Sequence, residues 1–163
     1  MKKMDFDGLA SWCGGNGYGL TDWRPTLPSS SERAKIPVPG DPQSLTELID
    51  TLVGLESAHG ETVVWIADWT IWNDRSQEVG LRHLTLLVDC YVDRALHDES
   101  HIYLLEPSEW RETIALVTVP LLYGWDAYLF FRSGAALVEV SHDAYIEVSV
   151  AHGFPMSVLN GWL

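Results

Sequence analysis

The sequence predicts an α+β fold in which three helices pack on one face of a mixed, mostly antiparallel sheet that ends in a three-stranded C-terminal meander. Two observations lead to this prediction. After residue 42, segments with helical and with strand periodicity alternate in the order helix, strand, helix, strand, helix. Three strand-like runs separated by short turns then follow, as in a meander. This order is typical of helices that cover one side of a sheet.

The 163-residue chain is long enough for one domain, and its N-terminal quarter has a different composition. Residues 1–42 contain a glycine-rich run, five prolines and three consecutive serines, so we expect turns and extended chain there. Apolar side chains such as Trp12 and Trp23 favour partial packing of this segment. The predicted organisation is a Gly/Pro/Ser-rich arm over 1–42 and a single acidic α+β domain over 43–163.

The three helices are predicted from apolar spacing and from their boundary residues. The first begins at a capping box formed by Ser44 and Glu47, after which apolar residues recur at helical spacing. The second begins near residue 73 or 74, where a capping Asn or Asp is followed by an apolar helix face. The third begins at Pro107 and is expected to end at Pro120, because proline lacks an N–H and clashes with the preceding turn.

Residues 62–72 form the most informative predicted strand, since they hold three tryptophans and a single carboxylate, Asp68. Their β-branched and aromatic residues favour a buried strand, where a carboxylate is unusual unless it is paired or hydrogen-bonded. Four further runs complete the predicted sheet: 101–105, 127–132, 136–141 and 145–151.

All of the net charge belongs to the predicted domain. Residues 1–42 hold five basic and five acidic side chains, whereas residues 43–163 hold five arginines, eighteen carboxylates and no lysine, which gives −13. A surface this negative repels phosphate backbones and anionic lipid, so we expect binding neither to nucleic acid nor to membranes. It attracts basic proteins and accelerates their association, although the same charge can serve solubility alone.

We expect a cytoplasmic protein with no metal and no cofactor. Cys13 and Cys90 are far apart and form no C-x-x-C pair, and no apolar segment follows the basic start. The segment 97–101 resembles the zinc motif H-E-x-x-H, but Asp98 replaces the glutamate that acts as general base. This segment reads as a turn entering a strand, where two histidines four residues apart do not share a metal.

Two aspartates that adjoin tryptophan are candidate binding residues. Asp68 precedes Trp69, with Trp72 three residues further on, and Asp126 follows Trp125. An acid in an aromatic cleft can have a raised pKa and act as a general acid, and tryptophan anchors many protein interfaces. The alternative is that these carboxylates accept hydrogen bonds that only stabilise the fold.

The C-terminal hairpin adds three candidates: Glu139, on its polar side, and His142 and Asp143, in the turn that follows. The run Ser141-His142-Asp143 has the residue types of a hydrolase triad, but consecutive residues of an extended chain point to opposite faces. We therefore interpret it as a turn. His142 is expected to titrate near neutrality if it lies beside Glu139 or Asp126.

A short internal echo links these candidates. Asp126-Ala127-Tyr128 recurs as Asp143-Ala144-Tyr145 seventeen residues later, and each copy places an acid just before a strand. The echo is too short for a structural repeat and is interpreted as recurring turn-to-strand chemistry.

Taken with the charge, these features favour a non-catalytic acidic binding protein that captures a basic protein partner, as immunity proteins and antitoxins do. A small hydrolase that uses Asp68, Asp126 or His142 in a Trp-lined cleft is the first alternative. A structural protein that associates with itself as a homo-oligomer is the second.

Overall fold

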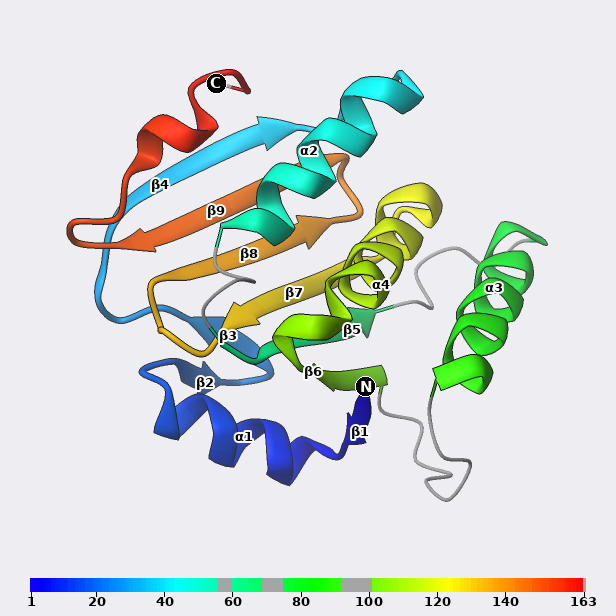
Figure 1. Cartoon of the computed structure of the whole chain (residues 1–163), viewed down its shortest axis with the longest axis horizontal. Helices are drawn as coiled ribbons and strands as arrows, with labels where there is room; N and C mark the ends of the chain where they lie inside the picture. Colours follow the sequence, from blue (N-terminus) through cyan, green and yellow to red (C-terminus); the bar gives the residue numbers. More distant parts are fainter. Residues whose placement is uncertain (56–59, 69–74, 92–100, 163) are drawn as a thin grey trace.

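A seven-stranded antiparallel sheet is the framework of the computed structural model (Figure 1). The structure describes residues 1–55, 60–68, 75–91 and 101–162. The strand order is β1-β6-β5-β7-β8-β9-β4, and a separate two-stranded hairpin is formed by β2 and β3. The α+β class is confirmed. The expectation of a mixed sheet is corrected, because every described pairing is antiparallel.

Helices and strands alternate along most of the chain, with a meander near the C-terminus. In chain order the elements are β1 (Lys2–Met4), α1 (Phe6–Gly15), β2 (Gly19–Thr21), β3 (Arg24–Thr26), β4 (Ser30–Pro37), α2 (Pro42–Gly54), β5 (Thr62–Asp68), α3 (Arg75–Tyr91), β6 (His101–Leu105), the 3₁₀ turn η1 (Pro107–Glu109), α4 (Trp110–Tyr123), β7 (Asp126–Phe131), β8 (Ala136–Ser141), β9 (Tyr145–Ala151) and the 3₁₀ turn η2 (Met156–Leu159).

The three helices predicted after residue 42 are present as α2, α3 and α4 and share one apolar core with the sheet. Helix α4 corrects one expected boundary, since it continues through Pro120 to Tyr123. It ends at Gly124, whose left-handed conformation (φ 62°) lets the N–H of Trp125 donate to the carbonyl of Pro120. No helix within the described ranges is both long and apolar enough to cross a bilayer.

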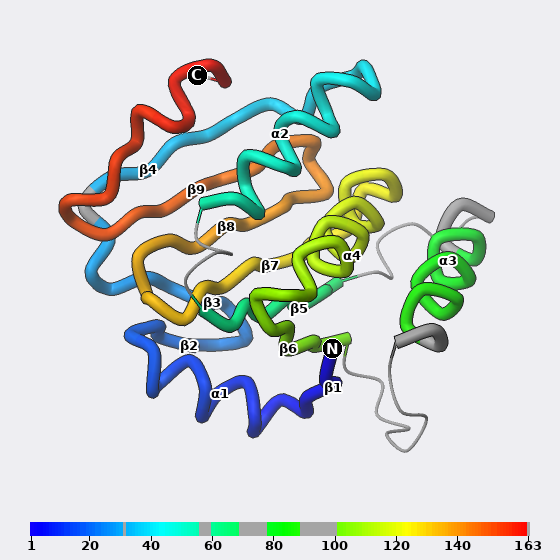
Figure 2. The backbone as a smooth tube through the Cα atoms, viewed as in Figure 1, coloured from blue at the N-terminus to red at the C-terminus, as the bar shows by residue number. Residues whose placement is uncertain are grey.

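The segment 1–42 differs from its predicted loop character. It contains α1, the β2–β3 hairpin and both edge strands of the sheet, β1 and β4, which lie at opposite sides in Figure 2. Leu9 and Cys13, one helical turn apart, are buried on α1, and Asp5 caps the helix by accepting from the N–H of Gly8. In this segment, glycine and proline mark the ends of short helices and strands and do not indicate a continuous loop.

Helix α1 and the β2–β3 hairpin cover part of the second face of the sheet. Residues of alternate positions on the central strands, such as Val63, Trp65 and Phe130, form a second apolar cluster with them. Tyr18 fastens this cover, because its buried hydroxyl accepts from the N–H of Phe131 at 2.9 Å and lies 2.7 Å from the carbonyl of Ala136. The cover is thus tied to the turn between β7 and β8.

Replacing Tyr18 with Phe should destabilise the protein by about 1–3 kcal/mol, because it leaves the buried N–H of Phe131 without its acceptor. Urea-induced unfolding measures this difference. Tyr145→Phe is the matched control, since the Tyr145 hydroxyl makes no hydrogen bond to other described residues and its removal should change stability little. Equal effects of the two substitutions would contradict the assigned role of Tyr18.

Candidate functional site

An open cavity of about 490 Å³ lies on the second face of the sheet, beside the turn of the β2–β3 hairpin. Its walls come from the end of β5, the start of β7, the end of β8 and the turn into β9. These elements meet at one end of the sheet because antiparallel neighbours bring the end of one strand beside the start of the next (Figure 1).

Five of the eight predicted candidates line this cavity together: Asp68, Asp126, Glu139, His142 and Asp143. They come from β5, β7, β8 and the β8–β9 turn, so the fold brings distant parts of the chain together. The five residues define the acidic cavity discussed below.

The tryptophans chosen from the sequence are placed differently. Trp125 is fully buried in the core on the helix-covered face, where its ring lies 5.6 Å from that of Tyr123, and it does not reach the cavity. Trp69 and Trp72 lie outside the described residues, as do the expected helix cap at residues 73–74 and the first four residues of the zinc-like segment.

His142 and Asp126 form the best-defined contact of the site. The Nδ1 of His142 lies 2.8 Å from Asp126 Oδ1, and the same oxygen accepts from the backbone N–H of His142 at 2.8 Å. Since an ionised carboxylate only accepts, Nδ1 carries the proton. The hydrogen bond to Asp126 raises the pKa of His142 above its ordinary value of 6.5. Burial opposes this rise, and the charges of Asp126, Asp143 and Asp68 add to it.

A β-bulge places Asp68 at the site. The pairing of β5 with β7 shifts between Ile66 and Asp68, so that Asp68 stands opposite Asp126. Bulges re-aim side chains at sheet ends in this way. Two carboxylates therefore face the same end of the cavity, with the His142 imidazole beside them.

Glu139 lies on β8, which is paired on both sides within the sheet. Its cross-strand neighbours are Tyr128 on β7 and Glu147 on β9. Burial raises the pKa of Glu139, and the charges of Glu147 and Asp126 add to the rise. Burial, with Glu139 and Asp126 nearby, also raises the pKa of Tyr128 to about 12, so its hydroxyl stays protonated.

Four aromatic side chains, which the sequence interpretation missed, complete the lining: Trp23, Trp65, Tyr128 and Tyr145. Trp65 and Tyr128 lie with ring centroids 5.2 Å apart. Trp23 is 66% exposed and sits in a two-residue turn in which its φ is 64°, an unusual value for a bulky residue. Its ring is held 4.0 Å from that of Phe6.

The side chains that line the acidic cavity carry a net negative charge. Asp22 of the hairpin turn brings the carboxylates to five, against the Arg24 guanidinium and the His142 imidazolium, which leaves −3 when His142 is protonated. Over the described parts of the chain, no three His, Cys, Asp or Glu side chains are arranged to hold a metal ion. The lining is instead suited to an organic cation, because it combines carboxylates with aromatic faces.

No protein-family model matches the sequence, and no curated protein or solved structure shows significant similarity to it. The chemistry of the site therefore rests on its own geometry.

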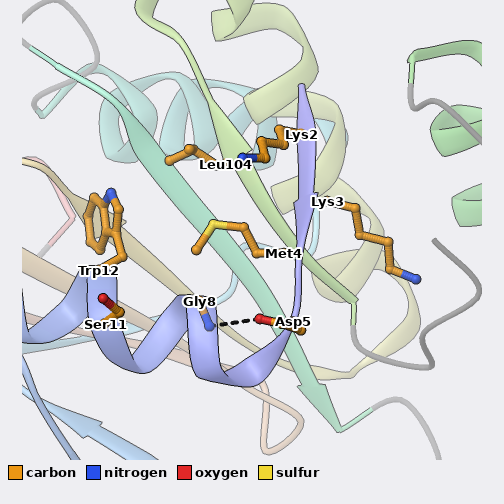
Figure 3. A pocket seen from close by; sticks show the side chains of 8 residues that line it. All are labelled: Lys2, Lys3, Met4, Asp5, Gly8, Ser11, Trp12 and Leu104. Carbon is orange, nitrogen blue, oxygen red and sulfur yellow. Dashed lines mark hydrogen bonds between the residues drawn. The ribbon is translucent and has the colours of Figure 1, made fainter. Parts of the chain in front are cut away.

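A second cavity, of about 500 Å³, lies between α1 and the β1 edge (Figure 3). Its lining is largely apolar, and its carboxylate, Asp5, is occupied in capping α1. Lys3 extends away from the other side chains shown in Figure 3. This cavity therefore presents fewer polar groups to a ligand than the acidic cavity does.

The raised pKa of His142 is testable by NMR titration of its ring protons. We expect a pKa above 6.5 in the native protein and a lower value in Asp126→Asn, with no change in the distant control Asp50→Asn. A His142 pKa that is unaffected by Asp126→Asn would contradict the described hydrogen bond.

The same shift has a consequence for stability. Folding raises the pKa of His142, so the protonated imidazole stabilises the folded state. Its contribution to the free energy of unfolding is complete below about pH 6.5 and is lost as the pH rises through the pKa of the folded state. His142→Gln should therefore destabilise the protein more at about pH 5 than at about pH 9, as measured by urea unfolding.

Proposed function

We propose that the protein is a non-catalytic acidic binding protein that captures a basic protein partner through the acidic cavity. The observation that carries this proposal is the convergence of five carboxylates from separate strands and turns in one open cavity flanked by aromatic rings. A concave surface of one sign raises the local concentration of oppositely charged groups and accelerates association.

Trp23 is positioned to supply the binding affinity that surface charge alone does not provide. Exposed charges give fast encounter but little affinity, whereas a large aromatic side chain that becomes buried in a complex contributes strongly to binding. Trp23 is largely exposed at the mouth of the cavity and is held by a tight turn and by Phe6. It is positioned to become the anchor of such an interface.

The proposal is tested by affinity capture from the lysate of the source organism, at about 50 mM and about 500 mM salt. The native protein should retain a basic partner at low salt and lose much of it at high salt. The double variant Asp68→Asn/Glu139→Gln should lose the partner at both. The matched control is Glu47→Gln/Asp50→Asn, which removes the same charge from exposed positions on α2 and should retain the partner.

Retention by the cavity variant equal to that of the control would contradict the proposal. So would the absence of a specific partner at either salt concentration.

The contact between His142 and Asp126 favours a small hydrolase as the second candidate. A histidine oriented by a carboxylate is the arrangement of a general base, and Asp68 lies at the same end of the cavity. If the protein hydrolyses any of a panel of chromogenic esters and glycosides, Asp68→Asn should abolish turnover and leave thermal stability nearly unchanged. A loss of stability would assign Asp68 to the fold instead.

A further inference from the structure

Glu139 occupies an electrostatically unfavourable position in the sheet. It lies directly opposite Glu147, and like charges at such a position destabilise a strand pair. Glu147 has nearby cations on β4, since Arg33 lies 3.4 Å away and Lys35 is its cross-strand partner. For Glu139, by contrast, no hydrogen bond or ion pair with another described residue is formed. The sheet thus holds a half-buried carboxylate whose charge a ligand can neutralise.

The surroundings of Glu139 select the kind of cation. Its neighbour Tyr128 packs against Trp65, and the largely exposed ring of Trp23 lies at the mouth of the same cavity. A guanidinium is planar, stacks on aromatic faces and donates parallel hydrogen bonds to carboxylates. An ammonium is a compact, strongly hydrated charge that gains less from aromatic walls.

We propose that the acidic cavity binds the guanidinium group of an arginine side chain. The inference rests on the proposed function and names the group by which the partner is recognised. Glu139 accepts the guanidinium N–H groups, and Trp23 stacks on the guanidinium plane. Asp126 is occupied by His142 and orients that side chain.

Arg24 modulates this site from within the chain. Its guanidinium lines the cavity, and its charge partly offsets the effects that raise the pKa of Glu139. One internal cation does not balance five carboxylates. Removing Arg24 increases the negative excess and should strengthen arginine binding.

The test is a ¹⁵N NMR titration with three blocked amino acids: Nα-acetyl-arginine amide, its lysine analogue and its citrulline analogue. Citrulline keeps the shape of arginine and lacks the charge. The arginine derivative should bind about tenfold more tightly than the lysine derivative, with shifts at the Trp23 indole, and the citrulline derivative should not saturate the site.

Two variants give opposite expected effects. Glu139→Gln should weaken arginine binding about tenfold and leave the free protein equally or more stable, because it removes the repulsion from Glu147. Arg24→Gln should tighten binding. Asp50→Asn, a charge change on the helix side, should alter neither.

Equal binding of lysine or citrulline would overturn the guanidinium assignment, as would unchanged affinity in Glu139→Gln. If a basic partner is nevertheless captured and lost in the cavity variant, the proposed function stands and only the recognised group is wrong. If neither arginine nor a partner binds, both are wrong.

Discussion

Strand β5, inside the sheet, is apolar on both faces, and the rest of the structure follows from the need to cover both. Val64 and Ile66 point into the core beneath the helices, whereas Val63 and Trp65 point to the opposite side. Burying each such side chain contributes about 1.5–3 kcal/mol, so neither face can stay in water. Helices α2 and α4 cover the first face, and the N-terminal segment returns to cover the second.

The acidic cavity exists because the N-terminal segment covers only part of the second face of the sheet. The β2–β3 hairpin has only three residues in each strand, and beyond it the second face of the sheet is polar. Both Asp-Ala-Tyr copies contribute to the lining, since β7 and β9 run in the same direction on either side of β8. Asp126 and Tyr128 thus line the cavity together with Asp143 and Tyr145. The echo in the sequence is the signal by which both tyrosines could have been found.

The hairpin of β8 and β9 was predictable because apolar and polar residues alternate along 138–141 and 146–150 and the turn between them is short. Trp125 was chosen for its adjacency to Asp126, but it is buried in the core on the helix-covered face, and Trp65 lines the cavity instead. Trp23 could not be predicted. Its turn contains no glycine or asparagine, although both central residues have positive φ. The short helix and strands of residues 1–42 were not predicted either, because glycines and prolines separate them.

The raised pKa values of His142 and Glu139 couple the charge of the acidic cavity to pH. As pH falls, Glu139 is protonated earlier than an ordinary glutamate, and His142 becomes positive earlier than an ordinary histidine. Both changes make the cavity less negative. As pH rises, both groups lose a proton and the cavity becomes more attractive to cations. Because a bound cation stabilises the ionised form of Glu139 and the neutral form of His142, ligand binding and proton release are linked in the same direction.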